Sequence, residues 1–232
     1  MPAFTNLERT TAVLVVFVMV AVPAYAQTAA PARLESTACQ PSASRPSKPA
    51  SRVKTTLIFL SGAASGLAVH ESGHVLFGAA FGAHPRVRPL EDSAIPFFKI
   101  VHDPVSRRQE FVISSAGLWM QHAGSEWMLT ARPHLRDEHA PFLKGMLAFD
   151  LATSTMYSVA AFARAGPPAR DTHGMAASLG RTGVPEPAIG LMVLAPAVLD
   201  GYRYVRPEAK WAAWASRSVK IAAVILTMAA GK

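Results

Sequence analysis

The sequence predicts an all-α membrane protein, a polytopic bundle of about five transmembrane helices. Half of the 232 residues are apolar and 16% are charged, whereas charged residues make up about a quarter of an ordinary soluble domain. The apolar residues lie in long runs rather than at amphipathic spacing, which is typical of helices that face lipid. A small surface β element is expected after the first span, where short apolar pieces alternate with Pro and Asp.

The charged residues restrict the class of partner. The net charge of +8 could indicate binding to nucleic acid. However, the Lys and Arg residues lie between the apolar runs and not on one face with interleaved aromatic residues, so membrane topology explains them better. We therefore expect no nucleic-acid partner. The single cysteine, Cys39, excludes an internal disulfide framework and a cysteine metal cluster within one chain.

Three segments divide the chain. Residues 1–26 have the pattern of a secretory signal peptide, because Arg9 precedes an apolar core and Ala24-Tyr25-Ala26 has the form of a cleavage site. An uncleaved anchor is the alternative. Residues 27–54 are rich in Pro, Ala and Ser and predict a disordered linker on the exported side. Residues 55–232 then form the membrane domain, and we expect a multi-pass protein of the bacterial inner membrane.

Five apolar runs predict the spans of this domain. The first covers residues 55–82 and contains Gly62-x-x-x-Gly66, a spacing that lets neighbouring helices approach closely. The surface strands are expected within residues 84–110. The remaining spans are expected at residues 111–129, 142–163, 188–204 and 211–229.

The first span carries the strongest chemical signal, the H-E-x-x-H motif His70-Glu71-Ser72-Gly73-His74. On a helix, His70 and His74 lie one above the other, where two imidazole nitrogens can bind one Zn²⁺. Glu71 is then close enough to take a proton from a metal-bound water. The motif also occurs by chance, and the alternative is a pair of hydrogen-bonded histidines beside an ion-paired glutamate. Three ionisable residues inside an apolar run favour zinc, because such groups are costly in lipid.

The motif resembles that of the site-2 protease family of intramembrane zinc metallopeptidases. The similarity rests on the run from His70 to Leu76, whose Gly73 before the second histidine matches the family's H-E-x-G-H form. The following run from Phe81 to Val87 is similar to the family's passage from this helix into a surface sheet. A weaker similarity is Ser115-Ala116-Gly117 in the second span. The resemblance implies a zinc cofactor, peptidase activity and a membrane-spanning protein substrate.

The resemblance also implies a third zinc ligand, an aspartate from a later segment, commonly within L-D-G after prolines. Three aspartates are candidates. Asp200 matches the letters best, Asp150 lies inside the third predicted span, and Asp171 follows Gly166-Pro167-Pro168. Depth favours Asp171, because the positive-inside rule places residues 164–183 on the membrane side nearer to the histidine motif.

Two further residues, His173 and Gln121, belong to this expected site. Asp171 could instead only cap a short helix that runs to Leu179. In that case His173 could be the third ligand; it could also support a ligand by hydrogen bonding. The family has an asparagine-bearing turn after its small-residue stretch, and Gln121 is the nearest amide here.

These residues predict a zinc metalloendopeptidase that cleaves membrane-embedded substrates. Zinc held by two histidines and an aspartate would activate water, Glu71 would act as the base, and Gln121 or a backbone N–H would stabilise the oxyanion. The alternative function is a non-catalytic membrane scaffold, a degenerate peptidase that binds partners without cutting them. A di-iron site is disfavoured, because no second E-x-x-H occurs in any predicted span.

Overall fold

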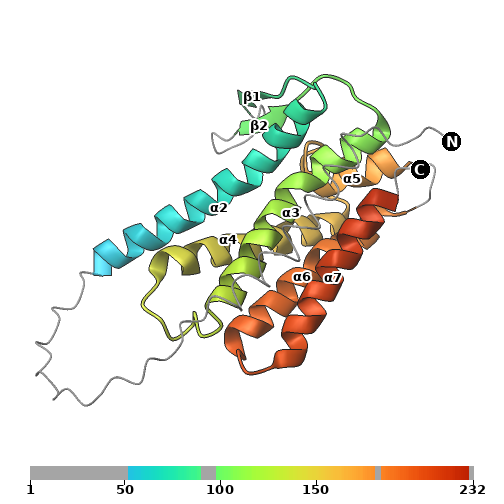
Figure 1. Cartoon of the computed structure of the whole chain (residues 1–232). Coiled ribbons are helices and arrows are strands. Elements are labelled where there is room, and N and C mark those ends of the chain that lie inside the picture. Colours follow the sequence, from blue (N-terminus) through green and yellow to red (C-terminus); the bar gives the residue numbers. More distant parts are fainter. Residues whose placement is uncertain (1–51, 90–97, 181–183, 230–232) are drawn as a thin grey trace, which may run out of the picture.

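The computed structural model describes residues 52–89, 98–180 and 184–229 (Figure 1). The predicted signal peptide, residues 1–26, and nearly all of the predicted linker lie outside these residues. The first described helix, α2, begins at Arg52, so the last residues assigned to the linker are helical.

The described residues form a helical bundle with a small two-stranded sheet at one end (Figure 1). The elements are α2 (Arg52–Ala80), β1 (Arg86–Pro89), β2 (Phe98–Val101), α3 (Arg107–Ala131), α4 (Pro141–Ala163), α5 (Asp171–Leu179), α6 (Glu186–Val205) and α7 (Lys210–Ala229). The predicted surface strands and the predicted short helix to Leu179 are therefore confirmed as elements of the fold.

Long helices lie at all five predicted span positions, but three of them have the length and composition to cross a membrane. These three are α2, α4 and α6. Helices α3 and α7 are continuous, but ionisable residues interrupt their apolar sequences. Among these residues are Glu126 on α3 and Lys220 on α7, both of which are buried. The structure thus supports a membrane protein with three candidate spans, and the prediction of five spans is supported in part.

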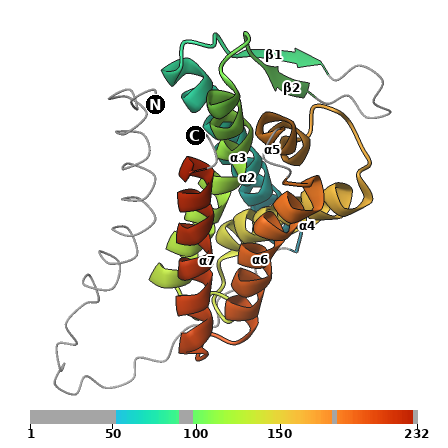
Figure 2. The ribbon, with the colours of Figure 1, turned by 90° about the vertical axis from the view of Figure 1, so that its right-hand side faces the viewer.

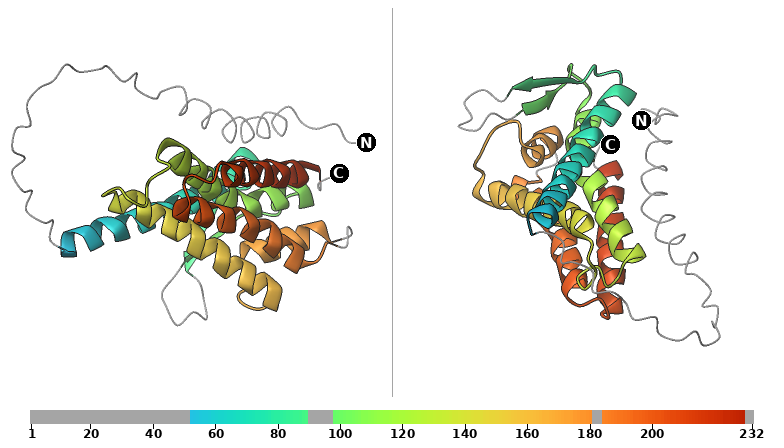
Figure 3. Two further views of the ribbon diagram at one scale, coloured as in Figure 1. Left: turned by 90° about the horizontal axis from the view of Figure 1, so that it is seen from below. Right: turned by 90° about the vertical axis from the view of Figure 1, so that its left-hand side faces the viewer.

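Helix α3 is the central element of the bundle. It packs against α2, α4, α5, α6 and α7, whereas α2 packs mainly against α4 and α3. Views from the side and from below show α6 and α7 side by side, with α3 and α4 between them and α2 (Figures 2 and 3). Because α3 contacts each of the other helices that the structure describes, polar side chains along it can connect opposite parts of the bundle.

Glycines allow α2 and α4 to approach closely. A Cβ at Gly62 would overlap the backbone carbonyl of Phe142, and a Cβ at Gly145 would overlap that of Phe59. A Cβ at Gly66 would meet the ring of Phe149 at 2.8 Å. The prediction that Gly62-x-x-x-Gly66 permits a close helix approach is therefore confirmed, as expected for interfaces of small residues.

The β1–β2 hairpin lies at the end of α2 and next to α5 (Figure 2). Gly82, with φ +68°, makes the turn that leaves α2. The strands pair antiparallel, with Val87 opposite Ile100. After the hairpin, Asp103 contacts His84 and Arg86, and these hydrogen bonds, first that of Arg86, hold the pKa of its carboxyl below the ordinary value. The hairpin is thereby tied to the segment that follows α2.

Candidate metal centre

Helix α2 presents the two motif histidines to the interior of the bundle. His70 and His74 are one turn apart and almost fully buried. Their rings lie edge to face with centroids 5.0 Å apart, and their Nε2 atoms are separated by 3.3 Å. The helical spacing therefore brings two imidazole nitrogens to one point, as the motif predicts.

The other ring nitrogen of each histidine is held by α3. His74 Nδ1 lies 2.8 Å from the carbonyl oxygen of Ile113, so it must carry a proton and donate it. His70 Nδ1 lies 2.8 Å from Oε1 of Gln121. With Nδ1 as the donor in both rings, each Nε2 presents a lone pair to the space between them.

Asp171 completes this group from the first residue of α5. Its Oδ2 lies 3.1 Å from His70 Nε2 and 3.5 Å from His74 Nε2. It is buried and, among the described residues, no donor makes a hydrogen bond of acceptable geometry to it. Three potential metal-binding atoms thus converge from α2 and α5.

The segment before Asp171 is fixed by an ion pair. Arg170, the residue at the N-terminus of α5, donates from Nε and Nη2 to both carboxylate oxygens of Glu186, each at 2.8 Å. This two-point contact is the strong geometry for a guanidinium and a carboxylate. Because Glu186 begins α6, the pair joins the start of α5 to the start of α6 and holds Asp171 facing α2.

Glycines on α3 and α5 leave room for the group. A Cβ at Gly117 would lie 2.5 Å from His74 Nε2 and 2.7 Å from His70 Nε2. A Cβ at Gly174 would overlap the hydroxyl of Ser114, so α5 can approach α3 closely only because this residue has no side chain. Gly73 has the same function for the contact between α2 and α3, where a Cβ would meet Ala116 at 2.7 Å. The site is therefore a cradle that one methyl group at position 117 would fill.

A cavity of about 460 Å³ opens onto the group. Glu71, His74 and Asp171 line its inner end, and β2 and the segment 167–170 line its outer end. Tyr157 on α4 also lines it, and its ring stacks on that of His70 with centroids 6.0 Å apart and 13° between the planes. A carboxylate and a phenol therefore share this cavity with the histidine–aspartate group.

The structure places the other candidate residues elsewhere. His173 is half exposed, lies 3.6 Å from Glu186 and does not belong to the group of His70, His74 and Asp171. Gln121 lies behind His70, where its Nε2 donates to Ser154. Asp150 and Asp200 lie in a second polar network, which Gln121 and Ser154 connect to His70 by hydrogen bonds.

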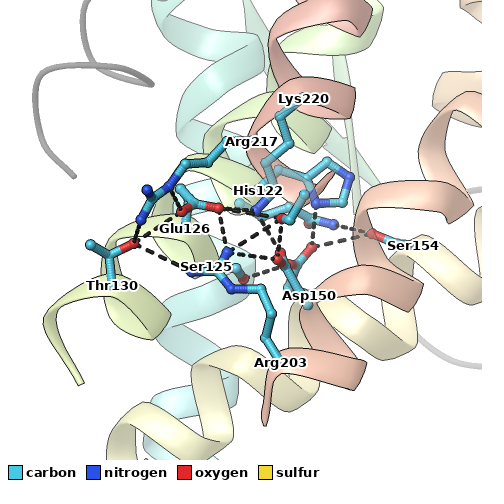
Figure 4. A network of polar contacts seen from close by, with 12 residues as sticks. His122, Ser125, Glu126, Thr130, Asp150, Ser154, Arg203, Arg217 and Lys220 are labelled. Atoms are coloured by element: carbon cyan, nitrogen blue, oxygen red, sulfur yellow. Dashed lines mark hydrogen bonds and ion pairs between the residues drawn. The ribbon is translucent and has the colours of Figure 1, made fainter. Parts of the chain in front are cut away.

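That network consists of charged side chains from four helices, all of them buried except Arg217, which is partly exposed (Figure 4). Glu126 on α3 contacts Arg203 of α6 and both Arg217 and Lys220 of α7. Lys220 Nζ also lies 2.7 Å from Asp200. Such groups are costly in an apolar environment unless they are paired, and here the pairs hold α3, α6 and α7 together.

A second group of possible metal ligands occurs within this network, formed by His122, Asp150 and Asp200. The ammonium of Lys220 already lies at hydrogen-bonding distance from the Asp200 carboxylate, 2.7 Å away. Asp150 accepts hydrogen bonds from Ser125 and Ser154, and its Oδ1 lies 3.2 Å from His122 Nδ1. A divalent cation would be repelled by Lys220, so this group functions as part of an ion-pair network.

Several residues of the site have no local sequence signal. Tyr157 and Ser154 are ordinary residues in the middle of an apolar run, and Ile113 contributes only its backbone carbonyl. Ser154 and Tyr157 follow Asp150 by four and seven residues, so helical spacing places all three on one face of α4, the only signal that the sequence holds for them. Comparison with protein-family models, with curated proteins and with solved structures found no match for this chain.

Proposed function

We propose that this protein is an intramembrane zinc metallopeptidase. The single observation that carries the proposal is the convergence of three buried acceptors, His70 Nε2, His74 Nε2 and Asp171 Oδ2, at separations of 3.1, 3.3 and 3.5 Å. Ligand atoms about 2.0 Å from a tetrahedral zinc lie about 3.3 Å from one another. Three lone pairs at these distances repel one another unless a metal ion or a shared proton lies between them.

The outer surface of the bundle supports the placement in a membrane. Large apolar side chains are exposed on α2, α4, α6 and α7, including Leu57, Met156, Leu191 and Trp214. In contrast, ionisable side chains such as Lys220 are buried. This distribution suits a lipid environment, and we propose that α3 and α7 cross the bilayer with the three apolar helices, with their charges directed inward.

The residues of the cavity have complementary chemical functions. Bound zinc would supply a Lewis acid that polarises a peptide carbonyl and lowers the pKa of water. Glu71 takes the proton of the attacking water and delivers it to the leaving amine. His70, His74 and Asp171 hold the metal, and the Gln121 and Ile113 oxygens orient the imidazoles.

Tyr157 is a better candidate than Gln121 for stabilising the oxyanion. The side chain of Gln121 is committed to His70 and Ser154 and lies behind the imidazole. Tyr157 lines the cavity and carries a hydroxyl donor. We therefore propose that Tyr157 donates to the oxyanion and that Gln121 orients His70.

The lining of the cavity supports a proposal for the substrate class. Its opening is bounded by β2, including Ile100 and Lys99, and by the Pro167-Pro168 segment. A peptide must be locally extended to place its carbonyl between Glu71 and the metal ligands, so a membrane-spanning substrate must unwind where it is cut. We propose single-span membrane proteins as substrates.

Glu71→Gln tests catalysis separately from metal binding. We expect this variant to keep its zinc, because Glu71 is not one of the three ligands, and to cleave about 10²–10⁴-fold more slowly. Cleavage would be measured on a panel of single-span reporter proteins in lipid vesicles, with the zinc content of the same samples. Glu208→Gln, an exposed carboxylate on the loop before α7, is the control. If Glu71→Gln cleaves at the wild-type rate, Glu71 is not the base, and zinc without cleavage of any reporter by the wild type would favour the scaffold.

A further inference from the structure

Three consecutive hydrogen bonds connect His70 to a buried carboxylate on another helix. His70 Nδ1 lies 2.8 Å from Gln121 Oε1, Gln121 Nε2 lies 2.9 Å from Ser154 Oγ, and Ser154 Oγ lies 3.2 Å from Asp150 Oδ1. All four side chains are buried. The chain runs from α2 through α3 to α4, and Asp150 and Ser154 are labelled at its far end in Figure 4.

Asp150 determines the direction in which the hydrogen bonds of this chain are donated. An ionised carboxylate only accepts hydrogen bonds, so Ser154 must donate its one hydroxyl proton to Asp150. The Ser154 oxygen then accepts from Gln121, which orients the Gln121 amide with Nε2 toward Ser154. Oε1 of the same amide is thereby turned toward His70.

The charges around Asp150 support its ionised state. The buried network has three cations and three carboxylates, namely Arg203, Arg217, Lys220, Glu126, Asp150 and Asp200. With His122 uncharged, it is neutral only when all three carboxylates are ionised. Asp150 also accepts a hydrogen bond from Ser125, which leaves this carboxylate surrounded by donors and the His122 ring.

We propose that Asp150 is a positioning residue that sets the tautomer of His70 through Ser154 and Gln121. Because Gln121 offers only an acceptor to His70, the imidazole must carry its proton on Nδ1 and keep the lone pair of Nε2 for the metal. His74 needs no such chain, since the carbonyl of Ile113 is an acceptor by its chemistry. The inference rests on the proposed function in taking His70 as a metal ligand.

Ser154→Ala removes the middle member of this hydrogen-bond chain, and Ser158→Ala is a matched control. Ser158 is buried one turn further along α4 and donates to the backbone carbonyls of Ser154 and Gly190, so the control removes the same kind of hydroxyl but none of the three side-chain hydrogen bonds from His70 to Asp150. In the metal-free full-length protein labelled with ¹⁵N-histidine, at a pH where the imidazoles are uncharged, we expect the His70 ring of the wild type and of Ser158→Ala to be protonated at Nδ1 only. In Ser154→Ala, we expect a mixture of the two tautomers.

A double variant distinguishes this effect from a general loss of packing. In Ser154→Ala with Gln121→Glu, the new carboxylate accepts from His70 directly, so the single Nδ1 tautomer should return. Zinc affinity, measured by competition with a chelator, should fall about 10–100-fold in Ser154→Ala. It should recover in the double variant. A His70 tautomer in Ser154→Ala identical to that of the wild type would overturn the proposal.

The metallopeptidase proposal and the positioning proposal can fail independently of each other. If the wild-type protein binds no zinc but its His70 tautomer responds to Ser154→Ala as expected, the metallopeptidase proposal fails while the positioning chain stands. If the wild type binds zinc and both serine variants bind it equally tightly with unchanged tautomers, only the positioning chain fails.

Discussion

At the scale of single residues, the candidate centre depends on a glycine, Gly117, as much as on the three candidate ligands. Gly117 lies on α3 where it passes the two imidazoles, and any Cβ there would lie within 2.7 Å of both Nε2 atoms. The backbone of α3 therefore forms one wall of the space between the three acceptors. A methyl group would occupy the position of a bound ion.

Gly117→Ala should reduce zinc affinity at least about 100-fold, because the added methyl group displaces the imidazoles or the ion, and loss of ligand geometry is costly for a metal site. Gly124→Ala on the same helix is the control, since no other group lies within 4 Å of a Cβ there. Helix propensity alone favours alanine by about 1 kcal/mol at either position. Zinc titration of both variants measures the difference, and equal affinities would show that Gly117 is not part of a metal site.

Part of this centre could be predicted from the sequence, and the rest could not, for physical reasons. His70, Glu71 and His74 are local on one helix, so their spacing predicts their geometry. Asp171 is distant in the chain, and only the depth argument from the positive-inside rule favoured it over Asp200. The contributions of Tyr157 and Ile113 could not be predicted, because they depend on how α4 and α3 pack against α2.

At the scale of elements, the hairpin is held to the rest of the chain by exposed charges. Asp103 accepts from Arg86 and His84, and its backbone N–H donates to the carbonyl of Ala83 at 2.8 Å. The charge contacts are open to solvent, so their contribution is screened by salt. Strand β2 lines the cavity, so the order of the hairpin affects access to it.

The hairpin should loosen at acid pH. The pKa of Asp103 is lowered in the folded protein, so the stabilising contribution is present above the unfolded-state pKa and is lost as the pH falls through the folded-state pKa. Hydrogen exchange of the β1 and β2 amides, corrected for the intrinsic pH dependence, should show weaker protection below that range. Asp103→Asn should make the protection independent of pH across it, and a hairpin equally protected in both proteins at all pH values would contradict this prediction.

The helices could be predicted well where one local property of the sequence determines them. Apolar runs marked the positions of α2, α3, α4, α6 and α7, and Pro and Gly marked their ends. The number of spans was less predictable, because α3 and α7 combine apolar stretches with charges whose partners lie on other helices. Glu126 and Lys220, for example, are 94 residues apart in the chain.

At the scale of the whole molecule, the protein has an apolar outside and a charged interior. The ion-pair network joins α3, α6 and α7 inside the bundle (Figure 4). Its members are nearly all buried, so removing one of them leaves an opposite charge without compensation.

Lys220→Met should destabilise the protein by about 3–5 kcal/mol, because Glu126 and Asp200 would lose a shared cation inside the bundle. Lys210→Met on the same helix is the control, since Lys210 is exposed. Unfolding of both variants in detergent, followed by circular dichroism, measures the difference. Equal stabilities would show that the network does not hold α7 in place.

The zinc content of the purified protein tests the central claim most directly. The wild type should retain one zinc per chain after washing with a weak chelator, and so should Asp137→Ala, in which an exposed aspartate is removed. Asp171→Ala should lose the zinc, because one of its three ligands from the protein is gone. A wild-type protein that binds no zinc, or an Asp171→Ala variant that binds it as tightly as the wild type, would contradict the account.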